Sequence, residues 1–222
     1  MRMRRKKHLE EKLAQCDNLI CFPHVDSDVR EAVQTKEYLD YAAVFGNDHP
    51  VHMEIGCGKG QFVTELAARH PELNFIAVEV NRNVVSMACH KAMEMGLTNV
   101  LFLQGGAELL QKYIPSGSIG RIYLNFSCPY PKTTYANRRL TNRKYLEIYQ
   151  DICAEGAEIH QKTDNMHFFE YSIEQFTAAG YKLKNVSLDL HASDFEGNIV
   201  TEYENRFASM GMPIYRLEAY RD

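Results

Sequence analysis

From residue 52 to residue 179, short apolar runs alternate with amphipathic segments, a pattern that predicts buried strands separated by helices. In the amphipathic segments, apolar residues recur every three or four positions. The expected strands are 52–55, 75–78, 100–103, 122–126 and 158–162, and the expected helices are 61–70, 83–95, 108–113, 142–154 and 166–179. This βαβα order indicates an α/β fold with a mostly parallel sheet and helices on both faces, which binds ligands at the carboxyl ends of its strands.

The pattern changes after Gly180. An extended stretch at 181–190, a helix at 201–210 and a strand at 213–218 predict a closing antiparallel pair. Residues 1–48 show no strand of their own, although 29–45 could be helical. We therefore expect an N-terminal basic arm with a helical extension over 1–48, and a single α/β domain over 49–222.

Composition narrows the class of protein. The chain has 222 residues, a hydrophobic fraction of 45% and a charged fraction of 24%, as expected of one globular domain. It contains no apolar stretch of roughly 20 residues, and its N-terminus lacks the apolar core of a secretory signal. The six cysteines, at positions 16, 21, 57, 89, 128 and 153, form no C-x-x-C pair. We expect a cytoplasmic protein with free thiols, no metal site and no membrane partner.

The net charge of −4 does not favour a nucleic-acid binder, but the basic residues are unevenly distributed. They form two clusters: Arg2, Arg4, Arg5, Lys6 and Lys7, and then Lys132, Arg138, Arg139, Arg143 and Lys144. For the first cluster, a solvated face and an arm that contacts RNA both remain open.

The most informative motif is the segment 52–62, HMEIGCGKGQF, in which a strand runs into glycines at 56, 58 and 60. Its G-x-G-x-G spacing differs from the G-x-G-x-x-G of dinucleotide binders, which weakens a nicotinamide oxidoreductase as an alternative. Glu54 before the turn suits a ligand that carries an ammonium group, and Glu79 after the next strand suits a ribose. These features favour S-adenosylmethionine, although an ordinary strand-to-helix turn is the simpler reading of the glycines alone.

Several segments in order carry a resemblance to a known family: MEIGCGKGQFV at 53–63, YLNFSCPYPK at 123–132, NRRLT at 137–141, EIHQKTDN at 158–165 and LDLHASDFEGNIVTEYE at 188–204. The chain resembles the bacterial tRNA (guanine-N7-)-methyltransferases, which are class I S-adenosylmethionine-dependent enzymes. The resemblance implies a Rossmann-like fold with a seven-stranded sheet over 49–222. It also implies methyl transfer from S-adenosyl-L-methionine to N7 of guanine 46 in the tRNA variable region, a modification step of tRNA processing, by a monomer or homodimer.

The resemblance also implies roles for individual residues. The cofactor positions are Glu54, Gly56, Gly58, Gly60, Glu79 and Gly106, and the tRNA positions are Lys132, Asp164, Thr201, Glu202, Tyr203 and Glu204. Lys132 would contact a phosphate, and Thr201 and Glu204 would help to frame the base. Asp164 would accept hydrogen bonds from guanine N1–H and the exocyclic amine. Alternatively, Asp164 or Asn165 caps the following helix.

Two family carboxylates are missing. Cys128 occupies the position of the family's catalytic Asp, and Gly106 the position of the Asp that contacts the adenine. In addition, Thr133, Thr134 and Asn137 occupy positions where the family has Lys or Arg. Guanine N7 carries a lone pair and no proton, so the reaction needs positioning rather than a general base. An acid would add attraction for the charge that moves toward guanine, which a neutral thiol cannot supply. We therefore expect an enzyme of reduced activity; the alternatives are a non-catalytic relative that binds tRNA or cofactor, and a nucleophilic Cys128.

Overall fold

A computed structural model describes residues 8–22 and 29–221. The basic cluster at 2–7 therefore lies outside the described residues. The chain divides into two compact units with a boundary between Pro115 and Ser116. The predicted division into 1–48 and 49–222 stays a prediction, and each compact unit is described by itself.

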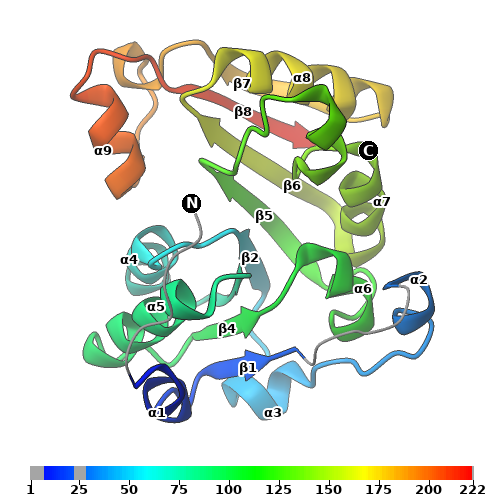
Figure 1. Cartoon of the computed structure of the whole chain (residues 1–222), viewed down its shortest axis with the longest axis vertical. Helices are drawn as coiled ribbons and strands as arrows, with labels where there is room; N and C mark the ends of the chain where they lie inside the picture. The colour runs from blue at the N-terminus through cyan, green and yellow to red at the C-terminus, as the bar shows by residue number, and fades with distance from the viewer. Residues whose placement is uncertain (1–7, 23–28, 222) are drawn as a thin grey trace. The chain divides into compact units, whose positions relative to one another are not determined.

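The first unit contains four parallel strands in the order β1-β4-β3-β2 (Figure 1). Its elements in chain order are α1 (Leu9–Ala14), β1 (Leu19–Cys21), α2 (Val29–Ala32), α3 (Tyr41–Phe45), β2 (Val51–Ile55), α4 (Gln61–Arg69), β3 (Asn74–Glu79), α5 (Arg82–Glu94), β4 (Val100–Gln104), the short 3₁₀ helix η1 (Ala107–Leu109) and α6 (Leu110–Tyr113). The three strands expected here from the sequence are all present. Their parallel pairing brings the carboxyl ends of β2, β3 and β4 to the same edge.

The expectation that residues 1–48 contribute no strand is wrong. Leu19–Cys21 forms β1, which pairs in parallel with β4 at the edge of the sheet. A strand of three residues is too short to show an alternating pattern, so no periodic signal predicts it. The helix expected over 29–45 is also divided, because the segment between α2 and α3 instead hydrogen-bonds to the end of α6 through the amides of Glu37 and Leu39.

Local signals explain how α4 and α5 are placed. Asn81 caps α5 by accepting a hydrogen bond from the amide of Asn83 (3.0 Å). Gly60 begins α4 with φ 79°, and a Cβ at this position would lie 2.7 Å from the Cβ of Ala88 in α5. Only glycine therefore allows the two helices to approach this closely.

The second unit contains strands in the order β5-β6-β8-β7. Its elements are β5 (Ile119–Asn125), the 3₁₀ helix η2 (Thr133–Arg138), α7 (Arg143–Ile152), β6 (Cys153–Thr163), α8 (Met166–Ala178), β7 (Lys182–Ser187), the 3₁₀ helix η3 (Leu190–Ala192), α9 (Glu202–Ala208) and β8 (Tyr215–Tyr220). The β5–β6 pair is parallel, whereas β8 runs antiparallel to both β6 and β7. The predicted mixed sheet with a C-terminal antiparallel pair is confirmed, but the described residues form eight strands rather than the predicted seven, because β1 adds one.

One face of this second sheet is apolar and is packed by α8 (Figure 1). Phe169 of α8 stacks on Tyr215 of β8, and Ile159 and Leu217 are buried. The alternate residues of β6 and β8, including Glu158, lie on the opposite face because successive side chains of a strand point to opposite sides. That second face carries most of the charged groups described below.

Candidate functional site

The turn between β2 and α4 presents backbone rather than side chains. Gly56 and Gly58 lie in the left-handed region, with φ 82° and 57°, and a Cβ at either position would meet no described atom within 4 Å. The turn is fixed because the amides of Gly56 and Cys57 both donate to the carbonyl of Val78, at 2.8 and 3.1 Å. Bare backbone at the carboxyl end of a strand allows a ligand to approach closely.

Glu79 lies at the end of β3 and is bound to this turn. Its carboxylate accepts from the amide of Gly58 (3.1 Å) and from the amide of Asn81 (2.8 Å). Each carboxylate oxygen has a second lone pair, so Glu79 can also accept from ligand hydroxyls. Glu54 on β2 is 3% exposed. Burial raises the pKa of the Cys57 thiol, and the negative charges of Glu54 and Glu79 raise it further. The thiol therefore stays neutral.

The loop after β4 carries a carboxylate that the sequence analysis did not identify. The amide of Gly105 donates to the carbonyl of Glu79 (3.1 Å), which places this loop beside the end of β3. A Cβ at Gly105 would overlap the ring of Phe22, and a Cβ at Gly106 would overlap the carboxylate of Glu108. Glu108 thus places an acid where a side chain at position 106 would begin.

The loop after β5 leaves the sheet in an uncommon conformation. Phe126 and Tyr130 have φ values of 51° and 41°, a region that non-glycine residues seldom occupy. The amide of Phe126 donates to the carbonyl of Lys162 (2.9 Å), which fixes the start of the loop beside β6. Cys128 and Lys132 are both exposed on this loop. Residues held in such conformations cluster at functional sites.

Arg139 fixes the other end of this loop. Its Nε donates to the carbonyl of Pro129 (2.9 Å), and one terminal nitrogen donates to the carbonyl of Tyr130 (3.0 Å). The guanidinium lies 4.3 Å from the ring centroid of Tyr171 in α8. The neighbouring Arg138 is exposed, whereas Arg139 is half-buried. The structure thus distinguishes two residues that the sequence analysis placed in one basic cluster.

Asp164 follows the end of β6, and the residue after it provides the helix cap. The side chain of Asn165 accepts from the amide of Phe168 (2.8 Å), so Asn165 is the N-cap of α8. Asp164 is half-buried, and burial raises the pKa of its carboxyl, although a backbone hydrogen bond acts in the other direction. The capping alternative is therefore met by Asn165, and the carboxylate of Asp164 is not the cap.

Glu204 lies at the centre of a buried polar cluster. It has no exposed surface, and its carboxylate accepts from the ammonium of Lys162 at 2.6 Å. The same ammonium donates to the carbonyl of Ile199 (2.9 Å) and to Asn198 Oδ1 (3.0 Å). The other oxygen of Glu204 contacts His191 Nε2 at 3.0 Å. These contacts join β6 to the segment 191–204.

The segment 201–204 begins α9 with a capping box. The Thr201 hydroxyl accepts from the amide of Glu204 (3.0 Å), and the Glu204 carboxylate lies 3.5 Å from the amide of Thr201. Tyr203 is 59% exposed, and Glu202 is also exposed. The direct role of these four residues in binding the base stays a prediction; of the four, Thr201 and Glu204 are buried.

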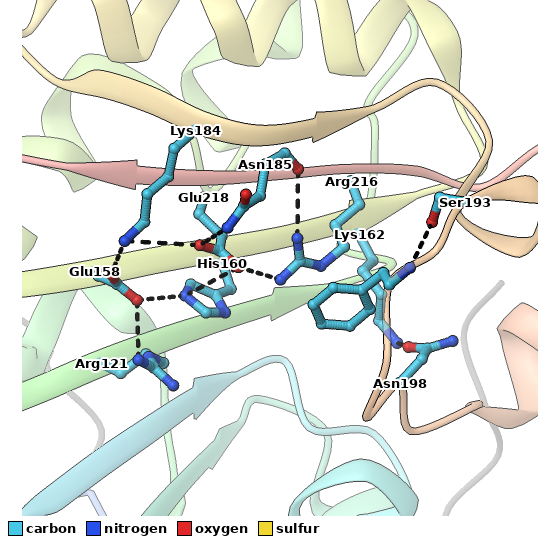
Figure 2. Close-up of polar contacts among 11 residues, drawn as sticks. Arg121, Glu158, His160, Lys162, Lys184, Asn185, Ser193, Asn198, Arg216 and Glu218 are labelled. Carbon is cyan, nitrogen blue, oxygen red and sulfur yellow. Dashed lines mark hydrogen bonds and ion pairs between the residues drawn. The ribbon is translucent and has the colours of Figure 1, made fainter.

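The polar face of the second sheet carries a charged network that the sequence analysis missed (Figure 2). Three groups of metal-ligating type lie within 4.8 Å of one another: Glu158, His160 and Glu218. Glu158 is paired with Lys184 and, at 2.9 Å, with Arg121. Glu218 is paired with Arg216. A divalent cation would have to compete with these three cations, so we interpret the group as an ion-pair network.

Titration in this network reflects the same contacts. Burial would raise the pKa of Glu158, but Lys184, His160 and Arg121 lower it to about 2. Burial lowers the pKa of His160 to about 4, against the opposite effect of its contact with Glu158 (2.8 Å). The imidazole is therefore neutral at pH 7, and the carboxylate is ionised.

The structure thus brings the predicted residues together in two groups. The cofactor candidates, from Glu54 to Gly106, surround the ends of β2, β3 and β4 in the first unit. The tRNA candidates lie in the second unit, and Lys162 links part of them: its carbonyl holds the loop before Cys128, its ammonium holds Glu204, and Asp164 lies two residues further along the chain. In the sequence, only the alternation of apolar and polar residues along β6 could have indicated which face of the sheet Lys162 lies on.

In the described ranges, 8–22 and 29–221, no helix combines the length and the apolar character needed to cross a membrane.

Comparisons with known proteins agree with this geometry. Residues 48–217 match a protein-family model described as "Putative methyltransferase". Among solved structures, the 16S rRNA methyltransferase KamB superposes with a TM-score of 0.62 at 17% identity, covering 84% of this chain and 95% of that one. At this level of identity the likeness concerns the fold alone, and it confirms the predicted Rossmann-like α/β class.

Relatives in sequence identify the family. A tRNA (guanine-N(7)-)-methyltransferase of Streptococcus uberis is 44% identical over 220 residues, which cover 99% of this chain and 100% of the relative. A protein of the same name from Listeria monocytogenes serotype 4b is 50% identical over 179 residues, 81% of this chain and 84% of the relative. Identity of this level over almost the full length of both proteins means that this chain belongs to the tRNA (guanine-N(7)-)-methyltransferase family.

Proposed function

We propose that this chain transfers a methyl group from S-adenosyl-L-methionine to N7 of a guanine in tRNA, at position 46 of the variable region. The observation that carries the proposal is the match over nearly the whole chain to relatives that bear this name. A cytoplasmic location, where tRNA is available, is part of the same proposal.

The residues of the first unit fit the proposed cofactor. Gly56 and Gly58 leave open space where side chains would stand, so the turn can lie against a ligand. Glu79 is held by two backbone amides and keeps lone pairs for the ribose hydroxyls. We assign Glu54 to the ammonium end of the methionine moiety and Glu108 to the adenine side, in place of an acid at Gly106. When bound, S-adenosylmethionine supplies an electrophilic methyl group on a sulfonium.

The residues of the second unit fit a guanine. Asp164 is an acceptor that is not used as a helix cap, and it can accept from both N1–H and the exocyclic amine. Adenine offers no such pair of donors, so this contact would select guanine. We assign Lys132, which is exposed, to a tRNA phosphate. Thr201 and Glu204 would act by holding the segment that presents Glu202 and Tyr203.

The chemistry needs no proton transfer to or from the attacking nitrogen. The task of the protein is to hold guanine N7 in line with the methyl group and to exclude water. Cys128 is exposed at the family's Asp position and contributes a thiol rather than a carboxylate. We propose that this lowers the rate of transfer, because a fixed negative charge near the guanine would stabilise the positive charge that develops there.

The test is transfer of labelled methyl from S-adenosylmethionine to an unmodified tRNA transcript, with the site mapped by strand cleavage at N7-methylguanine. A transcript made with 7-deazaguanine, which has a carbon at position 7, is the matched substrate control. Label at one guanine, and none in the control transcript, is the expected result. Label absent from the native chain but present in Cys128→Asp would favour the non-catalytic tRNA-binding alternative, and label on another base would refute the proposal.

A further inference from the structure

We infer that Arg139 is a positioning residue that holds the loop Phe126–Tyr130 in its functional shape, and that it is not a phosphate contact for tRNA. The inference rests on the proposed function, since it assigns a role within the same site. A basic run after a strand would ordinarily be assigned as a whole to the nucleic-acid backbone. Here the structure assigns its members to different roles.

The contacts that Arg139 makes with described residues are directed into the protein. Two of its nitrogens donate to consecutive backbone carbonyls, those of Pro129 and Tyr130, at 2.9 and 3.0 Å. One face of the guanidinium lies over the Tyr171 ring, 4.3 Å from its centroid. The Tyr171 hydroxyl in turn accepts from Asn142, the N-cap of α7, at 2.7 Å. Arg139 thus connects the loop to α8 and, through Tyr171, to the start of α7.

The loop needs such an anchor because its backbone is unfavourable. Phe126 and Tyr130 both occupy the left-handed region, which costs roughly 1 kcal/mol or more for each non-glycine residue. The amide of Phe126 is tied to Lys162, and Arg139 ties the last two carbonyls. Cys128 lies between these two anchors, so its position depends on both. A planar guanidinium can bridge the two carbonyls and stack at the same time, which an ammonium cannot do.

Arg138, the last residue of η2 and the neighbour of Arg139, provides a matched control. It is exposed, its guanidinium lies 4.9 Å from the Tyr135 ring, and it carries the same charge. If a side chain contacts a phosphate, removing its charge should reduce the slope of log Kd against log salt by about 0.9. We expect this reduction for Arg138→Gln. For Arg139→Gln, which removes the same charge, we expect an unchanged slope. For Arg139→Lys, which keeps the charge but loses the bridging geometry, we expect a kcat at saturating tRNA that is about tenfold lower.

A second measurement reports on the loop without requiring any activity. The chain contains no Trp, so Tyr130→Trp places a single fluorophore on the loop. In this background, Arg139→Lys should increase quenching of Trp fluorescence by acrylamide about twofold, because the loop becomes more mobile and more accessible. Arg138→Gln should leave the quenching unchanged.

Tyr171 keeps the inference testable if Arg139→Lys does not fold. Tyr171→Leu removes the ring under the guanidinium, whereas Tyr171→Phe keeps the ring and loses only the bond to Asn142. We expect increased quenching and lower kcat for the first substitution and a smaller effect for the second. Unchanged quenching in Arg139→Lys, together with a salt slope that is reduced in Arg139→Gln as in Arg138→Gln, would overturn the inference. If native protein fails to methylate tRNA, the proposed function fails, and the quenching experiment still decides the role of Arg139.

Discussion

Replacing Lys162 by Met tests whether the buried cluster around Glu204 holds the tRNA side of the site together. Met keeps most of the aliphatic stem, so packing changes little, but the three contacts of the ammonium are lost. Glu204 would then remain fully buried without its closest cation. Removing one member of a buried ion pair costs about 3–5 kcal/mol. Because Glu204 would keep its contacts with His191 and Asn198, we expect a value near the lower limit, about 3 kcal/mol.

Urea unfolding of the native chain, Lys162→Met, Glu204→Gln and the double variant measures this cost. With a slope of about 2 kcal/mol/M, a loss of 3 kcal/mol lowers the midpoint by about 1.5 M. In the double variant no charge is left unpaired, so it should be more stable than Lys162→Met alone. A loss below about 1 kcal/mol, or additive losses in the double variant, would refute the reasoning.

Three further predictions concern single positions. Cys128→Asp should raise kcat of methyl transfer to tRNA about tenfold with little change in cofactor affinity, and an unchanged or lower rate in a single-turnover assay would contradict the assignment. Gly106→Asp should add little to S-adenosylhomocysteine affinity while Glu108 is present, because its Cβ would overlap the Glu108 carboxylate and displace it. In a Glu108→Ala background the same substitution should tighten binding about tenfold by calorimetry, and equal effects in both backgrounds would contradict this. Glu158 has a pKa of about 2 in the folded protein against 4.5 as its reference value, so it contributes up to about 3 kcal/mol of stability above pH 4.5 that is lost as the pH falls toward 2. The difference in free energy of unfolding between the native chain and Glu158→Gln should therefore shrink below pH 4, and a difference that stays constant with pH would contradict the low pKa of Glu158.

The fold could be predicted where the pattern was long and regular. The strands and helices between 51 and 179 lie close to the expected positions, because burial on one or both faces imposes a period that the sequence shows directly. β6 is longer than expected, Cys153–Thr163 instead of 158–162, because its first half is only partly buried and shows no regular apolar pattern. β1 was missed because three residues at a sheet edge depend on the partner strand, which no local pattern reveals.

The sequence was sufficient to predict which types of residue belong to the candidate site, but not which atoms they contact. Glycine spacing and Glu79 identified the cofactor turn, since both depend on local backbone geometry. The roles of Glu108, Lys162 and Arg139 depend on which atoms meet across the fold. Arg139 shows this most clearly: its charge suggested RNA, whereas its position directs it to two carbonyls of its own chain.

The two lost carboxylates therefore have different expected consequences. At Gly106 the chain places the carboxylate of Glu108 at the same point, so the cofactor side keeps an acid in this loop. At position 128 the loop is held in an ordered shape and presents an exposed thiol. If both readings hold, the native chain binds S-adenosylmethionine with ordinary affinity and is slow only in the transfer step. A single substitution at Cys128 would then restore the rate, whereas changes around Gly106 would not.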